Sequence, residues 1–443
     1  MIKLLPTARL VVLLTGGVVP ALLYVVEQSF FSVWLVYNAV VIAAALADYL
    51  LLKKAQTPEV KREFPARVLT GSECEVKVSA TNRAARAVRC EIADEPPVEL
   101  LGRLPPDTFA AVVLAPDESG GYAYRLDTSV RGIFKFGAIN LRLAGPLGLL
   151  WRRTALKVED EIKILPDINL SGEEALEIHL RRYQSQEQRQ AHFVRYEGRE
   201  FDSLREFHPD DDPRHVDWRA SARAAKLITR VYRSEVNHEV LLCLDAGRLM
   251  GTSVEGRPKF DYALTAALRL AAASLALGDR PSMIVFADEI RAHIPAGKGP
   301  AHLPAMIDAV CDVHPVLRDP DFMGLMSRLD RVQRRRSLVV MLTDFSDAYS
   351  SDLMKVSLNT LARRHKVLFV AMGNPETRET AYQYPRDTEI VARSLVAAQM
   401  MRERREVLVA LSRAGMEVID ASPHEVGGRM INKYFEMKRV GRA

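Results

Sequence analysis

The chain is short of the features that mark secreted, catalytic and nucleic-acid-binding proteins. Its 443 residues include four cysteines, at positions 74, 90, 243 and 311, and no two of them form a C-x-x-C pair. We therefore expect buried thiols in a reducing compartment, without disulfides or a zinc site. The 61 Lys and Arg residues exceed the 56 Asp and Glu residues by only five. An excess of five positive charges over 443 residues is too small to indicate a nucleic-acid partner.

Catalytic motifs are also missing. The sequence has no G-x-S-x-G nucleophile elbow, no Walker A loop and no cysteine in a reactive context. A mean hydropathy of −0.05 excludes both a disordered chain and a polytopic transporter. The length indicates roughly two to three domains, each able to bury its own core. We expect no small-molecule cofactor.

Residues 1–54 differ from the rest because they hold two apolar runs. The first extends from Leu10 to Val26, and the second, from about Phe30 to Leu52, is broken only by Asn38 and Asp48. A membrane-spanning helix needs about 20 apolar residues. The sequence therefore predicts a transmembrane helical hairpin that contacts the lipid bilayer through residues 10–52. A cleaved signal peptide and a buried helical hairpin in a soluble fold are the alternatives.

Basic residues predict how the hairpin is oriented. They flank both apolar runs and are missing from the turn between them; the flanking residues are Lys3, Arg9, Lys53, Lys54, Lys61 and Arg62. Because basic residues favour the cytoplasmic side of a membrane, we expect both termini and all soluble domains in the cytoplasm.

Residues 55–168 are rich in short segments that alternate apolar and polar residues. The clearest are residues 73–80, 88–93, 110–114, 121–126 and 139–143. Alternating segments at a spacing of about 8 to 12 residues are typical of an antiparallel β-sandwich. Two glycine-rich stretches follow, at 131–137 and 145–151. We interpret them as strand bends or bulges, because neither has the glycine spacing of a phosphate-binding loop.

Residues 169–236 form a charged linker with many carboxylates and arginines. Asp212 and Pro213 predict a helix start, since the carboxylate can cap free N–H groups and proline fits the first helical turn. One hypothesis is a metal-dependent hydrolase site, built from His208, Asp210, Asp211, Asp212, His215 and Asp217. The spacing matches no established ligand motif, and the neighbouring arginines can neutralise the carboxylates. A capped helix that docks one domain onto another is therefore the favoured alternative.

Residues 237–443 alternate buried strands with helices. We expect strands at 238–245, 282–287, 337–344, 366–372 and 416–420, and helices at about 260–277, 303–313, 350–364, 388–413 and 424–439. This order predicts an α/β domain with a doubly wound, mainly parallel sheet. In such folds ligands bind at the carboxyl ends of the strands, where Asp245 and Asp344 are expected.

The segment from Arg195 to Arg223 resembles the signature of a bacterial family named domain of unknown function 58. It reads R-Y-x-G-R-E-F-D-S-L-R-E-F-x-P-x-D-D-P-R-x-x-D-W-R-A-S-A-R, and the two glycine-rich stretches are also similar to upstream segments of that family. The signature residues that we expect to carry an interaction are Arg195, Glu200, Asp202, Arg205, Asp211, Asp212, Pro213, Asp217, Trp218, Arg219 and Arg223.

The resemblance implies a multidomain chain. It consists of a transmembrane helical hairpin, an all-β immunoglobulin-like sandwich, the charged linker, and a C-terminal α/β doubly wound domain similar to von Willebrand factor A. Family members are commonly encoded beside MoxR-type AAA+ ATPases. We therefore expect a non-enzymatic adaptor at the bacterial inner membrane, whose partner is a MoxR-type ATPase and whose role is the assembly or maturation of other proteins.

The same resemblance raises the question of a magnesium site. Von Willebrand factor A domains hold a divalent cation through a D-x-S-x-S loop and a Thr and an Asp on neighbouring loops. Here the loop reads Asp245-Ala-Gly-Arg-Leu249, and Thr343 and Asp344 fit the later positions. Gly247 and Leu249 offer no side-chain oxygen, so water would have to complete the shell of a Mg²⁺ ion. The favoured alternative is two aspartates that cap helices or pair with Arg248.

Overall fold

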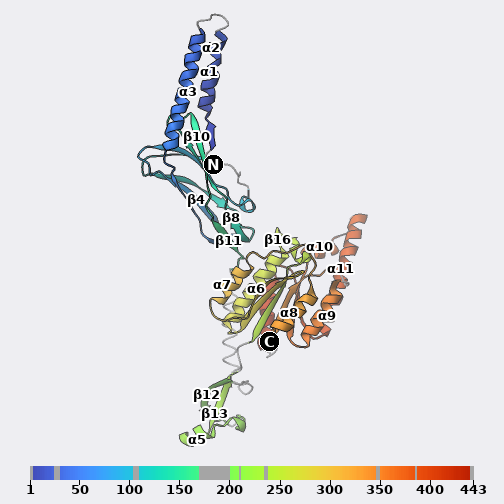
Figure 1. The fold of residues 1–443 in the computed structure, drawn as a ribbon. Helices are drawn as coiled ribbons and strands as arrows, with labels where there is room; N and C mark the ends of the chain where they lie inside the picture. Colours follow the sequence, from blue (N-terminus) through green and yellow to red (C-terminus); the bar gives the residue numbers. More distant parts are fainter. Residues whose placement is uncertain are drawn as a thin grey trace. The chain divides into compact units, whose positions relative to one another are not determined.

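A computed structural model of the chain describes residues 3–23, 30–102, 109–168, 200–208, 211–233, 238–345, 350–384 and 387–439. The chain divides into two compact units, Met1–Leu165 and Pro166–Ala443. In Figure 1 the first is coloured blue to cyan-green and the second green to red. The predicted combination of an apolar N-terminal helix with β-sheets and further helices is confirmed. All four cysteines are free and buried.

The N-terminal unit carries an apolar helical arm (Figure 1). Its outgoing half is α1 (Ala8–Gly16) and α2 (Val18–Leu23), and its returning half is α3 (Phe30–Lys54). By length and composition α3 is able to cross a membrane, whereas the outgoing half is shorter. Apolar side chains cover the outside of both halves, with exposed fractions of 67% for Val12 and 63% for Ile42. An apolar surface of this extent is typical of a segment that lipid or another protein covers.

The two halves of the arm approach each other closely at a tyrosine. The Tyr37 hydroxyl of α3 donates a hydrogen bond of 2.6 Å to the Leu13 carbonyl of α1. A Cβ atom on Gly16 would lie 2.8 Å from the same hydroxyl. Glycine therefore permits the contact that joins α1 to α3.

Three sheets share the hydrophobic core of the rest of this unit. Their strand orders are β1-β10-β9-β5-β6, β3-β11-β8 and β2-β4-β7. All pairs are antiparallel except β3 with β11. The strands are β1 (Lys3–Pro6), β2 (Glu59–Glu63), β3 (Arg67–Leu69), β4 (Cys74–Thr81), β5 (Val88–Ala93), β6 (Ala110–Leu114), β7 (Ser119–Leu126), β8 (Gly132–Lys135), β9 (Ile139–Ala144), β10 (Leu150–Leu156) and β11 (Glu161–Leu165). In β4, buried and solvent-facing residues alternate because one face packs into the core.

Both ends of the helical arm join this β-rich body. Before α1, strand β1 pairs with β10 in the register Lys3 to Arg153, and after α3 the chain enters β2. The strand at residues 3–6 is not predicted by the sequence pattern. Because the two ends are joined to the same body, both lie on the same side of any membrane that the arm enters.

A buried carboxylate at the base of α3 holds the arm to the body. Asp48, which has no exposed surface, accepts hydrogen bonds from the backbone N–H groups of Leu147 (2.8 Å), Leu149 (3.0 Å) and Leu150 (2.9 Å). A Cβ atom on Gly145 would overlap the Asp48 carboxylate. The second glycine-rich stretch therefore cradles a carboxylate of its own chain.

An arginine completes this joint by capping the end of α3. The Arg152 guanidinium of β10 donates to the carbonyls of Leu52 (2.9 Å) and Ala55 (3.0 Å), and also to the Thr57 hydroxyl (3.0 Å). The last carbonyls of a helix have no hydrogen-bond donor within the helix. Arg152 supplies donors for two carbonyls at the end of α3, which an apolar environment could not do.

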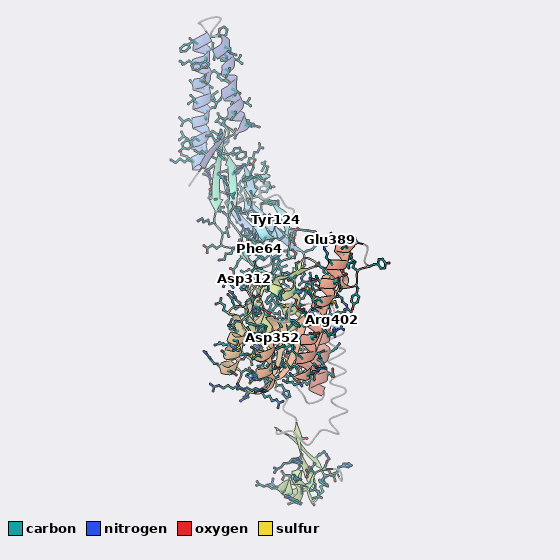
Figure 2. The ribbon with its side chains drawn as sticks, turned by 90° about the vertical axis from the view of Figure 1, so that its right-hand side faces the viewer. Phe64, Tyr124, Asp312, Asp352, Glu389 and Arg402 are labelled. Carbon is teal, nitrogen blue, oxygen red and sulfur yellow. The ribbon has the colours of Figure 1, made fainter. Side chains whose placement is uncertain are left out.

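Arg62, which the sequence predicts among the basic residues that follow the second apolar run, is not a surface charge. Its side chain is fully buried, where it pairs with Asp94 and, at 2.8 Å, with Asp160. The Tyr124 hydroxyl donates to Asp94 at 2.6 Å, and the Arg62 guanidinium lies 4.4 Å from the centre of the Phe136 ring, which packs on Phe64. Figure 2 labels Phe64 and Tyr124 in this body. Lys53 and Lys54 in the last turn of α3 remain as flanking charges.

The C-terminal body is a six-stranded sheet in the order β18-β17-β14-β19-β20-β21. All its strands are parallel except the edge strand β18. They are β14 (Glu239–Asp245), β17 (Arg280–Phe286), β18 (Ile290–Ile294), β19 (Leu338–Thr343), β20 (Lys366–Met372) and β21 (Glu417–Ala421). The order reverses between β14 and β19, and a doubly wound sheet opens a crevice at the carboxyl ends of such a pair.

Helices surround this sheet (Figure 1). They are α6 (Lys259–Ala276), α7 (His302–Val310), α8 (Phe322–Val332), α9 (Ser350–Ala362), α10 (Pro375–Ala381), α11 (Thr388–Arg413) and α12 (Val426–Arg439). Between β14 and α6 lie η3 (Arg248–Gly251), β15 (Ser253–Val254) and β16 (Arg257–Pro258). Strands β14 and β19 are almost entirely apolar and buried, as expected of parallel strands that are covered on both faces.

Candidate functional site

The described signature residues from position 200 onward lie in one small module, residues 200–233, which we call the signature module. Strand β12 (Glu200–Glu206) pairs antiparallel with β13 (Ile228–Arg233). The connection between them contains the 3-10 turn η2 (Pro213–His215) and the short helix α5 (Trp218–Ala224). Figure 1 shows α5 beside the hairpin of β12 and β13.

Asp217 begins α5 and joins it to the hairpin. One carboxylate oxygen accepts the backbone N–H groups of Arg219 (3.0 Å) and Ala220 (2.9 Å), which is the geometry of an N-cap. The other oxygen accepts the Arg230 guanidinium of β13 at 2.9 Å. The hydrogen bond from Ala220 and the pairing with Arg230 lower the pKa of Asp217. This residue therefore has a structural role as an ionised cap.

Asp211 and Asp212 are occupied in the same way. Asp211, which is buried, accepts the Arg205 guanidinium at 2.5 Å and the backbone N–H of His208 at 2.8 Å. Asp212 caps η2 through the Arg214 N–H at 2.9 Å, with Pro213 in the first position of the turn. The predicted helix start at Asp212 and Pro213 is therefore a 3-10 turn, and the longer helix begins at Asp217.

Other side chains of the signature module are exposed. Trp218 is 70% exposed, and Leu204 and Leu227 are 45% and 47% exposed. Arg219 and Arg223, one helical turn apart on α5, are exposed and make no side-chain hydrogen bond or ion pair with the residues that the structure describes. The signature thus contains two sets of residues. Its structural half, which includes Asp211, Asp212 and Asp217, holds the module together. The side chains of its exposed half, Trp218, Arg219 and Arg223, make no such contact within the described module.

These contacts disfavour the hydrolase hypothesis. A catalytic or metal site needs carboxylates with free oxygens, whereas Asp211, Asp212 and Asp217 bind backbone N–H groups and arginines. Within the described parts of the chain, no group of three His, Cys, Asp or Glu side chains is placed to hold a metal ion. Arg195 and Asp210 lie outside the described residues, as do the side chains of Glu200 and Asp202.

The second candidate region is the crevice at the carboxyl ends of β14 and β19, where Asp245 and Thr343 meet. The Thr343 hydroxyl donates to one Asp245 oxygen at 2.5 Å, and the Gly247 N–H donates to the other at 2.7 Å. Asp245 is 1% exposed. Burial, reinforced by the charges of Asp344 and Asp319, raises the pKa of Asp245 to about 7.

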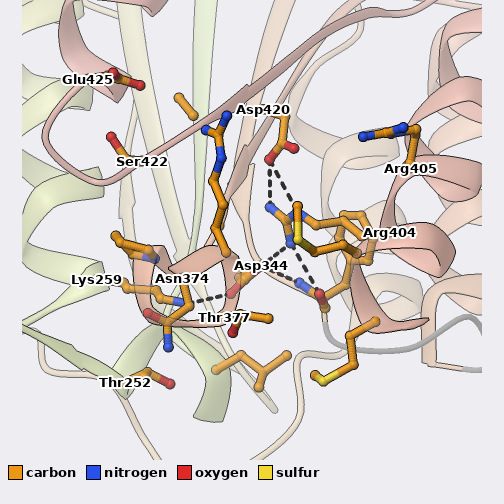
Figure 3. A pocket seen from close by; sticks show the side chains of 18 of the residues that line it. Thr252, Lys259, Asp344, Asn374, Thr377, Arg404, Arg405, Asp420, Ser422 and Glu425 are labelled. Atoms are coloured by element: carbon orange, nitrogen blue, oxygen red, sulfur yellow. Dashed lines mark hydrogen bonds and ion pairs between the residues drawn. The ribbon is translucent and has the colours of Figure 1, made fainter. Parts of the chain in front are cut away.

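Asp344, the next residue, lies between two cationic side chains. The Lys259 ammonium from the start of α6 is 2.6 Å from one carboxylate oxygen, and the Arg404 guanidinium of α11 is 2.6 Å from the other (Figure 3). Arg404 also pairs with Asp420 at 3.0 Å and lies over the Phe345 ring at 4.8 Å. Lys259 is 3% exposed, so its ammonium group is a buried positive charge.

This donor set does not fit a magnesium ion. Mg²⁺ requires near-octahedral oxygen coordination, but Gly247 and Leu249 offer no side-chain oxygen. Both oxygens of Asp245 are already occupied by hydrogen-bond donors, and Lys259 supplies a positive charge at Asp344. The predicted alternative, a pairing of these aspartates with Arg248, is not what the structure has, because Arg248 lies 3.3 Å from Asp319.

Sequence reasoning missed three residues of this crevice: Lys259, Arg404 and Asp420. Lys259 precedes the apolar periodicity of α6, where a lysine normally faces solvent. Arg404 lies in a charged stretch of α11 that gives no sign of a buried face. Only the doubly wound fold, which brings the ends of β19 and β21 to one edge, places these residues together.

Comparison with known proteins supports the resemblance found in the signature. Residues 203–383 match the family model described as "Protein of unknown function DUF58". Uncharacterized proteins of Mycobacterium bovis and Mycobacterium tuberculosis are 24% identical over 184 residues. Those matches cover 41% of this chain and 57% of the mycobacterial relatives. The chain therefore spans little more than half the length of these relatives.

Solved structures give weaker likenesses. The conserved hypothetical protein BatB from Bacteroides thetaiotaomicron aligns with a TM-score of 0.31 and 13% identity, over 46% of this chain and 99% of that one. An uncharacterized membrane-spanning protein from Vibrio fischeri aligns with a TM-score of 0.17 and 14% identity, over 46% and 98%. At such TM-scores neither structure adds to what the strand order of this chain already establishes.

Proposed function

We propose that this chain, which carries a DUF58 match over residues 203–383, is a membrane-anchored interaction protein and not an enzyme. The exposed half of the signature module carries this proposal. Some signature residues hold the module together, and others stay exposed. This division fits a module that presents Trp218, Arg219 and Arg223 to a partner.

The exposed side chains of the signature module indicate which kind of partner surface they would bind. A largely exposed tryptophan beside two arginines is typical of protein-binding hot spots, in which an indole enters an apolar pocket and guanidinium groups meet carboxylates. The partner surface is therefore apolar at its centre and acidic at its rim. We further propose that the partner is a MoxR-type AAA+ ATPase and that the pair acts in the assembly or maturation of other proteins.

The helical arm supports the membrane part of the proposal. We propose that residues 10–52 enter the bacterial inner membrane as a hairpin, with the soluble bodies in the cytoplasm. The arm is apolar on its outside, both of its ends join one β-rich body, and Lys53 and Lys54 end α3 at its base. The joint at Asp48 would then lie at the cytoplasmic surface.

The finer fold assignments belong to the same proposal. We assign the β-rich body to immunoglobulin-like sandwiches and the C-terminal body to von Willebrand factor A-like domains. A mainly parallel sheet with its switch point between β14 and β19 supports the second assignment. In place of a metal, we propose that Lys259 supplies the positive charge at the crevice, so that the domain functions without Mg²⁺.

A binding experiment tests the proposed partner and surface together. The full chain in detergent would be immobilised and exposed to the purified MoxR-type ATPase of the same genome. Trp218→Ala combined with Arg219→Glu and Arg223→Glu should weaken binding by about a hundredfold or more, as expected when hot-spot residues are lost. Arg334→Glu combined with Arg363→Glu, which alters two exposed arginines of the C-terminal body and changes the net charge by the same amount, is the control and should bind normally. No binding by the unmodified chain, or equal binding by the triple variant, would contradict the proposal.

A further inference from the structure

A cavity of about 390 Å³ opens at the carboxyl edge of the C-terminal sheet (Figure 3). Its walls come from the start of α6, the segments that follow β19, β20 and β21, and the helices α10 and α11. It lies in a different part of the chain from the signature module. An inference about the cavity therefore does not depend on the role of that module.

Basic side chains outnumber acidic ones in this cavity. The cationic lining residues are Lys259, Arg378, Arg404, Arg405 and Arg429, and the anionic ones are Asp344, Asp420 and Glu425. Lys259 and Arg404 are already paired with Asp344 and Asp420. The excess positive charge therefore comes from the other three lining arginines.

Two of these arginines are available to a ligand. Arg378 of α10 and Arg405 of α11 are exposed, and neither makes a side-chain hydrogen bond or ion pair with the residues that the structure describes. Arg429, by contrast, donates to the Asp420 carbonyl at 2.5 Å. Two guanidinium groups from facing helices can bind the oxygens of one carboxylate in the forked geometry that arginine favours.

Apolar side chains extend from the cavity along α10 and α11. Met400 and Tyr382 line the cavity and are 38% and 75% exposed. Val396, one helical turn before Met400 and therefore on the same side of α11, is 63% exposed. A small inorganic anion would leave these side chains in water, whereas a peptide with apolar residues beside its carboxylate would cover them.

We propose that this cavity is a metal-independent binding site for an acidic peptide segment of a partner protein. One Glu or Asp side chain of that segment pairs with Arg378 and Arg405, and its apolar neighbours pack on Met400 and Val396. Lys259 and Arg404 neutralise Asp344 and Asp420 at the floor of the cavity, so the site needs no divalent cation.

The test measures fluorescence anisotropy with the full chain in detergent and EDTA present. The probe is a short fluorescein-labelled peptide in which one glutamate lies between leucines in a Gly-Ser frame; a matched peptide carries glutamine instead. Arg378→Gln with Arg405→Gln should weaken binding of the glutamate peptide about tenfold or more, the scale of a lost charge-assisted pair. Arg402→Gln, an exposed arginine of the same helix that does not line the cavity (Figure 2), should bind like the unmodified chain.

The outcomes separate this proposal from its competitors. Tighter binding of the glutamate peptide than of the glutamine peptide, in EDTA and dependent on Arg378 and Arg405, supports it. Equal binding of the two peptides, binding only after Mg²⁺ is added, or no loss in the double variant would overturn it. Displacement of the peptide by inorganic phosphate, at concentrations where chloride has no effect, would also overturn it by identifying a small-anion site. The signature module stays unaltered in every arm, so failure here leaves the proposed function untouched.

Discussion

Replacing Lys259 by methionine tests whether an ammonium holds the crevice together. Methionine keeps much of the aliphatic stem but removes the charge that lies 2.6 Å from Asp344. The two side chains are 3% and 8% exposed, so solvent cannot replace the lost partner. Breaking a buried ion pair by removing one partner typically costs about 3–5 kcal/mol. Asp344 keeps Arg404 and the Phe345 N–H, so we expect the lower end, about 3 kcal/mol.

The buried cysteines provide a separate readout for each unit of the full chain. Cys243 lies in β14 beside the crevice and Cys90 lies in β5 of the β-rich body, and neither has exposed surface. Because a buried thiol reacts only when its surroundings open, its labelling rate reports the free energy of opening. In Lys259→Met, a loss of about 3 kcal/mol should speed the labelling of Cys243 by about a hundredfold. The labelling of Cys90 should not change.

A double-mutant cycle with Asp344→Asn isolates the pair itself. We expect a coupling free energy of about 2 kcal/mol between positions 259 and 344, in the range measured for directly contacting residues. A coupling below about 0.5 kcal/mol, or equal acceleration at Cys243 and Cys90, would refute the claim that Lys259 acts as the resident cation of the crevice.

Three further substitutions probe other parts of the structure. Asp48→Leu leaves the N–H groups of Leu147, Leu149 and Leu150 without their acceptor, so the opening free energy at Cys90 should fall by about 3 kcal/mol or more; unchanged labelling would argue against the joint. Asp245 has a folded pKa raised from 3.8 to about 7, so it binds its proton more tightly when folded, and stability should fall by about 4 kcal/mol as pH rises from about 4 to 7. Asp245→Asn should remove that slope at Cys243, after correction for intrinsic thiol reactivity, and a persistent slope would contradict the assignment. Asp217→Ala removes the N-cap of α5 at a cost of about 1 kcal/mol, which should speed amide hydrogen exchange at Ala220 without changing the labelling of Cys243.

Much of the fold follows from periodicity, and the exceptions have physical causes. Strands such as β5 and β20 and the long helix α11 begin and end where the sequence pattern predicts, because burial of one or both faces imposes a regular pattern. Strand β18 was missed because it is a short, partly exposed edge strand. Strand β1 was missed because its partner, β10, lies about 150 residues away in the chain, and local periodicity carries no information on such pairing.

The candidate sites were less predictable because charge alone does not reveal burial. The sequence shows a cluster of aspartates at 210–217, but their division into caps and ion pairs depends on where β13 brings Arg230 and the backbone of Ile228. Asp48 interrupts an apolar run and has no local partner in sequence. Its three hydrogen-bond donors come from a stretch about a hundred residues later. In each case the fold, and not the residue type, determines the role.

The most direct test of the central claim observes Trp218 itself while the partner binds. The chain contains three tryptophans, so fluorotryptophan labelling gives a simple ¹⁹F spectrum in which Trp218→Phe identifies one signal. On titration with the MoxR-type ATPase, the Trp218 signal should shift or broaden as its exposed ring becomes buried, while the signals of Trp34 and Trp151 stay in place. A complex that forms with the Trp218 signal unchanged would show that the exposed half of the signature is not the binding surface.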